Sequence, residues 1–346
     1  MRLLFFYTRD RSSSAESFAT EGLHALFSKM LEAGCVDEIR VVIDTYGTAG
    51  EIRYAPGYSC CRVNGFGPEI LKPGDIVWIR GGFKPWLPFI DYCRKNNWWL
   101  LFYGANTGRE RWPFWDVVFD DITGHTRIDA NGRLWLDYRK PVNPDIFHRI
   151  DTVPEYDLCI GASHIHDKKG QWRGVKAAVA YREMYGKDLY CIIPGAMHRG
   201  VMTNGILEDI RTHDLDIELT GMLPRHLLTI MMNRSKVFAH LGSGGQGDRG
   251  PIEAMACGCP VIIGFPKYHS QWVNRAAAVL DDPDDFEEIA EKIHTALIKA
   301  ASRKAISEHF EAEAGIETQS LPMIMRLFDV LRRRLRADRR VLEAFK

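Results

Sequence analysis

Short apolar runs alternate with amphipathic stretches along the chain. Runs of this length, bounded by polar and turn-forming residues, are typical of buried strands. Between the first two runs, the segment Ala15–Leu31 places Phe18, Leu23, Leu26 and Met30 on one broad face, which predicts a helix. The predicted strands of this first set are Leu3–Tyr7, Ile39–Ile43, Asp75–Ile79, Leu100–Tyr103 and Val117–Phe119.

A second set of the same kind begins near Tyr156. The proline-rich stretch from Pro141 to Pro154 separates the two sets and suits a linker. The alternation predicts an α/β fold of two Rossmann-like domains with parallel sheets, in which ligands bind beyond the carboxyl ends of the strands. The second set comprises predicted strands at Leu158–Ile160, Tyr190–Ile193, Ile217–Leu219, Val237–Leu241 and Pro260–Ile263, and predicted helices at Trp172–Tyr185 and Asp284–Ala300.

Composition narrows the class of protein. The 346 residues favour two domains, and 45 basic residues balance 45 acidic ones. A net charge of zero argues against a whole-surface electrostatic grip on nucleic acid or an acidic membrane. No apolar run approaches the ~20 residues that a membrane helix needs. The eight cysteines show no zinc spacing and several lie in apolar strands, so we expect free buried thiols in a reducing cytoplasm.

The run Gly242–Gly247 satisfies the pattern G-x-G-x-x-G directly after a predicted strand. A dinucleotide site also needs a helix that starts at the glycine turn and an acidic residue after the next strand. Here Pro251 is the natural first helical residue, and the strand Pro260–Ile263 is followed by residues without a carboxylate. The glycines therefore favour a ligand other than NAD.

The segment from Glu253 to Val261, EAMACGCPV, resembles the E-A-M-A-x-G-x-P-V segment of retaining GT-B glycosyltransferases. This family is also called glycosyl transferases group 1, or glycosyltransferase family four-like. A helix that begins at Pro251 would turn its positive end toward a sugar diphosphate, and Glu253 would accept hydrogen bonds from the ribose hydroxyls. Gly258 would end that helix as a C-cap. The simpler alternative makes Glu253 a helix-terminal carboxylate that stabilises by ~0.3–1 kcal/mol.

Further segments carry the same resemblance. Residues 140–147 resemble the family segment that leads into the donor domain. Gly161, followed by Lys168-Lys169-Gly170, resembles the strand–Gly-Arg–Lys-Gly element that grips the diphosphate. The resemblance implies that Lys169 contacts the β-phosphate and that Arg173 stands in for the family arginine, whereas the alternative for the lysines is a solvated basic loop. Gly221 and Met222 resemble the loop that meets the nucleobase.

Two departures from the family pattern concern the donor. The family arginine is absent after Gly161, and Gly245 replaces the sugar-contacting glutamate eight residues before Glu253. Asp248 or backbone N–H groups of the glycine run would then hold the sugar. The predicted donor site comprises Gly161, Lys169, Arg173, Gly221, Met222, Gly244, Gly245, Gln246, Gly247, Asp248 and Glu253.

The segment His164-x-His166-Asp167 offers too few ligands, too closely spaced, to specify a metal. The family resemblance implies metal-independent chemistry. We therefore expect no metal and no cofactor, and a UDP- or GDP-sugar as the donor substrate.

The N-terminal half, which the resemblance assigns to the acceptor, resembles the GT-B family less closely. Arg9, Arg11 and Ser12 follow the first predicted strand, and the two arginines favour a phosphate-bearing substrate, although a polar loop that caps a helix explains them equally. Asn106 and Arg109 follow Leu100–Tyr103, where many relatives place a histidine that is missing here. These five residues are the acceptor-side candidates, and no catalytic residue is assigned.

The resemblance implies three parts. Residues 1–148 form an acceptor-side domain, residues 149–312 a nucleotide-sugar donor domain, and residues 313–346 a helical segment that packs back on the first domain. The same basic, amphipathic tail is also compatible with contact at a membrane surface.

The predicted function is glycosyl transfer from a UDP- or GDP-sugar to an acceptor hydroxyl with retention of configuration. The acceptor could be a glycan, a lipid-linked sugar, a small molecule or a modified base. Three alternatives remain open at this point: a non-catalytic nucleotide-sugar-binding relative, a GT-B sugar-nucleotide epimerase and an inverting transferase.

Overall fold

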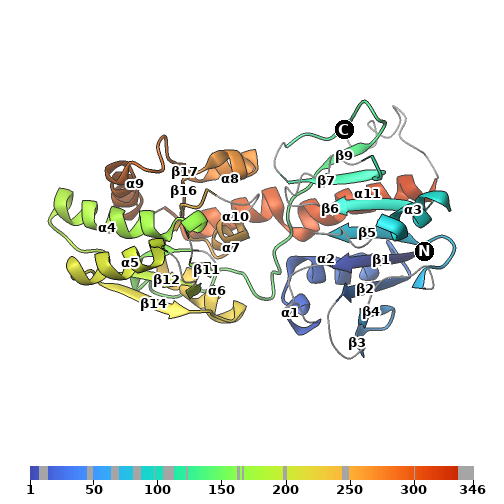
Figure 1. The fold of residues 1–346 in the computed structure, drawn as a ribbon, viewed down its shortest axis with the longest axis horizontal. Helices are drawn as coiled ribbons and strands as arrows, with labels where there is room; N and C mark the ends of the chain where they lie inside the picture. Colours follow the sequence, from blue (N-terminus) through green and yellow to red (C-terminus); the bar gives the residue numbers. More distant parts are fainter. Residues whose placement is uncertain are drawn as a thin grey trace. The chain divides into compact units, whose positions relative to one another are not determined.

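The computed structural model describes residues 1–7, 15–44, 50–63, 70–80, 87–96, 98–103, 113–121, 124–161, 164–165, 167–197, 201–243, 249–299 and 301–333. The chain divides into two compact units. Unit 1 consists of Met1–Asn143 together with Ala314–Lys346, and unit 2 of Pro144–Glu313 (Figure 1).

Unit 1 is built on a mixed sheet. Within the described residues the strand order is β3-β4-β2-β1-β5-β6-β7-β9-β8, and all pairs are parallel except β3 with β4 and β8 with β9. The parallel strands confirm the five that the apolar runs predicted. The strands are β1 (Arg2–Tyr7), β2 (Glu38–Asp44), β3 (Gly50–Ala55), β4 (Tyr58–Val63), β5 (Ile76–Arg80), β6 (Trp99–Tyr103), β7 (Val117–Asp120), β8 (Arg127–Ile128) and β9 (Leu134–Asp137).

Both faces of the unit 1 sheet are buried, because side chains alternate along each strand. On β1, Phe5 and Tyr7 join a core with Phe27 of helix α2 (Gly22–Glu32). Leu4 and Phe6 join a second core with residues of helix α3 (Leu87–Lys95) on the other face. This two-sided burial is the physical reason that the strand sequences are almost continuously apolar.

The helix predicted over Ala15–Leu31 is two helices, which corrects that interpretation. Helix α1 spans Ala15–Ala19 and α2 begins at Gly22. Thr20 and Glu21 lie between them. Glu21 has an extended backbone, and its buried carboxylate accepts hydrogen bonds from Tyr7 and Arg80. Apolar periodicity continued across the break, so it could not reveal this polar contact.

The C-terminal segment packs back on unit 1, as the GT-B resemblance implied. A short π-helix (Ile316–Ser320) leads into α11 (Leu321–Arg332), whose apolar side chains enter the core that contains Leu3 and Phe27. Figure 1 shows this red helix beside the blue and cyan strands. Most apolar side chains of α11 are buried in this core, whereas Met325 is 43% exposed. Contact of the basic C-terminal helix with a membrane surface stays a prediction, and the residues beyond Arg333 lie outside the described part of the chain.

Unit 2 contains an all-parallel sheet with strand order β14-β12-β10-β15-β16-β17 over its described residues. The second set of predicted strands is thereby confirmed. Three short strands were not predicted: β17 at the edge of this sheet, and β11 and β13, which pair with each other apart from it. The strands are β10 (Tyr156–Ile160), β11 (His164–Ile165), β12 (Cys191–Pro194), β13 (Ala196–Met197), β14 (Ile217–Gly221), β15 (Ser235–His240), β16 (Val261–Ile263) and β17 (Ala278–Val279).

Helices cover the sheet of unit 2. Side chains of α4, α5 and α9 pack with Leu158, Ile193 and Val237 in one core. None of the described helices of the protein combines the length and apolar character that crossing a membrane requires. The helices of unit 2 are α4 (Gln171–Tyr185), α5 (Val201–Thr212), α6 (Arg225–Arg234), α7 (Arg249–Ala256), α8 (Gln271–Ala276), α9 (Phe286–Lys299) and α10 (Arg303–Ala314), the last of which ends at the unit boundary.

Candidate functional site

The strand order of unit 2 has a topological switch point between β10 and β15. The chain winds from β10 outward to β12 and β14, then returns to β15 on the other side of β10 and continues to β16 and β17. In open α/β sheets, ligands bind beyond the carboxyl ends of the strands at such a switch point. The loops that follow β10 and β15 there are the two that the sequence assigned to the diphosphate.

These two loops lie against each other without space for side chains. Gly170 has a left-handed backbone (φ +73°), and a Cβ atom there would lie 2.1 Å from the carbonyl oxygen of Leu241. A Cβ on Gly242 would lie 2.9 Å from the carbonyl oxygen of Lys168. The backbone around Lys169, which is half-buried, therefore touches the beginning of the glycine run.

Gly161, which directly follows β10, allows close packing against β15 at the carboxyl edge of the sheet. Its N–H donates to the carbonyl oxygen of Ala239 at 3.0 Å, which extends the pairing of β10 with β15. A Cβ at this position would lie 2.1 Å from the ring of Phe238. Only a glycine lets β10 end beside that ring, whatever ligand lies beyond it.

Helix α7 begins at Arg249, two residues before Pro251, which corrects the predicted start. Proline is tolerated in the first turn because the N–H it lacks has no partner within the helix. The predicted C-cap at Gly258 is confirmed. Gly258 (φ +72°) donates to Met255, and Cys259 donates to Ala254, the two bonds of a Schellman motif.

Glu253 is buried in α7, with 6% of its surface exposed. Its Oε1 atom accepts a hydrogen bond from Nη1 of Arg225 at 2.9 Å. Arg225 is the first residue of α6, which follows β14. The sequence interpretation missed this arginine, because the pair joins positions 28 residues apart in the chain.

The short segment between β14 and α6 contains an exposed side chain, that of Met222. Gly221 has a positive φ of +70°, and its carbonyl oxygen accepts a hydrogen bond from the N–H of Gly195 at 2.8 Å. Met222 follows with 58% of its surface exposed. An exposed, flexible thioether beyond the carboxyl end of a strand suits a contact with a flat ring.

Comparison with known proteins identifies unit 2. The family model "glycosyl transferases group 1" matches residues 146–312, nearly the whole of this unit. Unit 2 is a group 1 glycosyltransferase domain. No curated protein sequence matches the chain.

Solved structures extend the likeness to both units. The E. coli trehalose-6-phosphate protein bound with UDP-2-fluoro glucose has a TM-score of 0.68 at 11% identity, and the match covers 96% of this chain and 99% of that chain. Sucrose-phosphate synthase from Thermosynechococcus elongatus has a TM-score of 0.68 at 14% identity, over 96% and 98%. At these identities the likeness establishes the GT-B fold. The chain therefore has the GT-B fold, and its unit 2 carries the match to group 1 glycosyltransferases.

Arg173 lies in α4, and its guanidinium forms hydrogen bonds with other residues of unit 2. Nε lies 2.8 Å from Oδ1 of Asp284, and Nη1 donates to the carbonyl oxygen of Leu241 at 3.4 Å. The group also stacks on Trp172 and Phe265, at 4.3 and 5.1 Å from their ring centroids. These contacts tie α4 to the loop that follows β15, and a contact of Arg173 with phosphate stays a prediction.

Several predicted site residues lie outside the described residues. They include the core of the glycine run on the donor side and all five acceptor-side candidates. Among the residues that the structure does describe, no cluster of three metal-ligating side chains occurs; the metal-free reaction and the lack of a cofactor stay predictions. The residues outside the description are Arg9, Arg11, Ser12, Asn106, Arg109, His166, Gly244, Gly245, Gln246, Gly247 and Asp248.

The cysteines beside Glu253 are not candidate nucleophiles. Burial raises the pKa of the Cys257 thiol well above its usual range and that of Cys259 to about 12. Their reactive thiolate forms are therefore scarce at neutral pH. A catalytic group in the segment around Glu253 would therefore be a residue other than these two cysteines.

A buried polar network occupies the carboxyl edge of the unit 1 sheet, and the sequence interpretation missed it. Arg80, at the end of β5, lies 3.2 Å from Glu21 and within 5.5 Å of the ring centroids of Tyr7 and Tyr103. Tyr103 ends β6, and Asp121 accepts hydrogen bonds from its hydroxyl and from Lys140, at 2.9 and 2.8 Å. Polar residues directly after apolar strands were the available signal.

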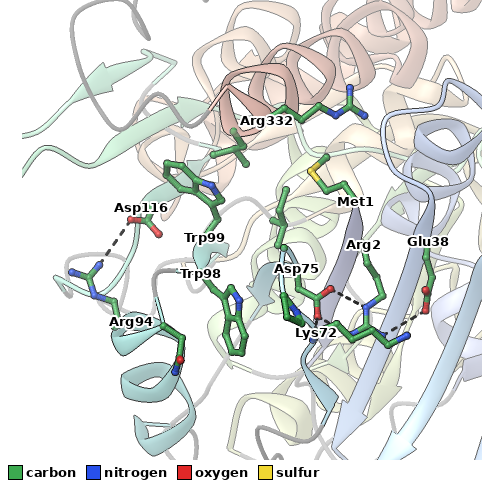
Figure 2. Close-up of a pocket in the computed structure, with 15 residues that line it drawn as sticks. Met1, Arg2, Glu38, Lys72, Asp75, Arg94, Trp98, Trp99, Asp116 and Arg332 are labelled. Atoms are coloured by element: carbon green, nitrogen blue, oxygen red, sulfur yellow. Dashed lines mark hydrogen bonds and ion pairs between the residues drawn. The ribbon is translucent and has the colours of Figure 1, made fainter.

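A pocket of about 1040 Å³ lies elsewhere in unit 1, at the amino ends of its strands. Figure 2 shows Trp98 and Trp99 on one side of it and Met1, Arg2 and Asp75 on the other. Arg2 donates to both carboxylate oxygens of Asp75, at 3.0 and 2.7 Å. The pocket is thus on the edge opposite to the Arg80 network, away from the edge at which α/β sheets usually bind ligands.

Proposed function

We propose that the protein transfers a sugar from a nucleoside-diphosphate sugar to an acceptor hydroxyl, with retention of configuration. The observation that carries this proposal is the convergence at the switch point of unit 2. There the Lys168–Gly170 segment touches Leu241 and Gly242, and the buried Glu253 lies in the helix that follows the glycine run. The bound UDP-2-fluoro glucose of the E. coli relative supports a UDP-sugar as donor.

Most groups of the predicted donor site have a proposed task. Glu253 accepts hydrogen bonds from the ribose hydroxyls, and Met222 and the backbone at Gly221 meet the nucleobase. Lys169 provides a compact positive charge for the β-phosphate. Backbone N–H groups of residues 244–247 and the amino end of α7 complete the anion site.

The reaction breaks the bond between the anomeric carbon and the diphosphate oxygen. The acceptor oxygen forms a new bond to that carbon, and the acceptor proton leaves with the diphosphate or passes to water. Negative charge grows on the leaving diphosphate, so Lys169 and the N–H groups at the amino end of α7 stabilise the transition state more than the ground state. We propose no metal and no cofactor for this chemistry.

The acceptor is proposed to bind at the carboxyl edge of unit 1. The Arg80 network lies there, next to the strand ends that precede Arg9, Arg11, Ser12, Asn106 and Arg109. A neutral set of paired charges and hydroxyls suits a polyhydroxyl acceptor, whose hydroxyls both donate and accept. We also propose a reducing cytoplasm as its location, because all eight cysteines are free and buried.

A ligand screen tests the donor assignment. The free energy of unfolding should rise by ~2.7 kcal/mol in a UDP- or GDP-sugar at 100 times its dissociation constant. Glu253→Ala should remove this rise, whereas Lys236→Met, which removes an exposed ion pair with Asp157, should keep it. Donor binding or turnover that Glu253→Ala leaves unchanged would contradict the assignment.

One sequence feature favours a second function. Because Gly245 replaces the family glutamate that contacts the sugar, a non-catalytic nucleotide-sugar-binding protein is the alternative. Tight donor binding without turnover across a broad panel of acceptors would establish that alternative.

A further inference from the structure

Arg225 stands where an α-helix disfavours a cation. It is the first residue of α6, and Pro224 at the N-cap provides no side-chain hydrogen bond. The amino end of a helix carries a partial positive charge, so a cation there is unfavourable unless an anion compensates it. An anionic partner is therefore needed to stabilise the Arg225 guanidinium at this end of α6.

Glu253 is that partner. Nη1 of Arg225 and Oε1 of Glu253 are 2.9 Å apart, and their side chains are 22% and 8% exposed. The guanidinium also lies 5.9 Å from the ring centroid of Phe147. A buried carboxylate needs a partner with good geometry, and a guanidinium held by a ring and a carboxylate has little freedom to rotate.

The ion pair uses only one carboxylate oxygen. Across the described part of the chain, no hydrogen bond is made to Oε2 of Glu253. The pair also links two segments with different proposed tasks. Arg225 lies three residues after Met222, which is proposed to contact the nucleobase. Glu253 lies in α7, the helix proposed to contact the ribose.

We propose that Arg225 is a positioning residue for nucleotide recognition. It holds Oε1 of Glu253 so that Oε2 remains available to the ribose hydroxyls, and it fixes the distance between the base-binding segment and α7. This inference rests on the proposed function. It adds that selectivity for a ribonucleotide depends on a residue that need not contact the nucleotide.

The experiment measures dissociation constants by titration calorimetry for UDP and 2′-deoxy-UDP, and for the guanosine pair if the wild type prefers GDP. The proteins are the wild type, Arg225→Met, Arg225→Lys, Glu253→Gln, the double variant R225M/E253Q and the control Lys236→Met. Lys236 forms a 2.7 Å ion pair with Asp157 at the amino ends of β15 and β10, so the control removes a cation of the same unit far from the switch point. Thermal unfolding checks that each variant folds.

The wild type should prefer UDP to 2′-deoxy-UDP by about tenfold, the value of a hydrogen bond to a charged group. Arg225→Met should reduce that preference to about twofold or less, because it frees the Glu253 carboxylate to rotate. Arg225→Lys should retain part of it, since lysine keeps the charge without the planar fork. The double variant should be no weaker than Glu253→Gln alone, because the two residues act through one contact.

Three outcomes would overturn the inference. An Arg225→Met variant that folds and weakens both nucleotides equally shows a role other than ribose positioning. An Arg225→Met variant that keeps the wild-type preference shows no role at all. A wild type that binds neither UDP nor GDP removes the proposed function and this inference together, whereas the first two outcomes leave the proposed function intact.

Discussion

Arg173 and Asp284 form an ion pair of 2.8 Å that joins α4 to the segment before α9. The arginine side chain is 9% exposed and the aspartate side chain 57%. The same guanidinium donates to the carbonyl oxygen of Leu241, at the start of the glycine run. A structural role of Arg173 at the donor site follows from these contacts, independently of any phosphate.

Arg173→Met should lower the free energy of unfolding by roughly 1–3 kcal/mol, because it removes charged hydrogen bonds and two ring contacts. Asp284→Asn should cost less, since the exposed carboxylate is easily replaced by water. Urea denaturation of both variants measures the difference. An Arg173→Met variant of wild-type stability that has lost donor affinity would instead establish a direct phosphate contact.

Gly170→Ala should be far more harmful than Gly186→Ala. Both glycines have left-handed backbones, with φ of +73° and +63°. A Cβ at position 170 meets the carbonyl oxygen of Leu241 at 2.1 Å, whereas nothing lies within 4 Å of a Cβ at position 186. Gly186→Ala should cost about 1 kcal/mol of strain. Gly170→Ala should cost several times as much and weaken donor binding, as denaturation and nucleotide titration would show; equal costs would mean that the loops separate freely.

Arg80→Met should destabilise the protein by about 3 kcal/mol, because it removes a cation from the nearly fully buried carboxylate of Glu21. Adding Glu21→Gln should recover part of the loss, since the uncompensated charge is then gone. A double-mutant cycle of unfolding free energies measures this coupling. Additive effects of the two substitutions would contradict a buried ion pair.

Asp129 should make the protein sensitive to acid. Burial alone would raise the pKa of Asp129, but hydrogen bonds from Arg133, Trp135 and the backbone of Asn131 outweigh it and lower the pKa to about 2. With a folded pKa below the unfolded value of about 3.9, its contribution of about 2–3 kcal/mol is present above pH 4 and is lost as the pH falls toward 2.

Asp129→Asn tests this pH dependence. The stability difference between the wild type and the variant should be largest at neutral pH and should shrink between pH 4 and pH 2. Urea denaturation at several pH values provides the measurement. A difference that does not change with pH would show that the carboxylate is not the cause.

The fold was largely predictable because buried parallel strands have a simple sequence pattern. Leu3–Tyr7 and Val237–Leu241 are apolar almost throughout, since helices or loops cover both faces of their sheets. The hairpin of β3 and β4 was not predicted, because β3 is mostly exposed and its residues lack a regular apolar alternation. The break at Glu21 was hidden because its cause, the contact with Tyr7 and Arg80, involves distant strands.

The candidate site was predictable only where a local pattern carries it. Glu253 and Gly258 lie in one contiguous segment, and a helix end has recognisable residues. Arg225 could not be found this way, because its partner lies on another helix. The contact of Gly170 with Leu241 likewise depends on two chain segments that only the folded sheet brings together.

A sugar-transfer assay tests the proposed glycosyltransferase activity most directly. The purified protein would be incubated with UDP-glucose or GDP-mannose and a panel of acceptors, and nuclear magnetic resonance would follow nucleoside diphosphate release and the anomeric proton of the product. We expect stoichiometric diphosphate and product, a product with the anomeric configuration of the donor, and loss of both signals in Glu253→Ala. A product of inverted configuration, or turnover that persists in Glu253→Ala, would contradict it.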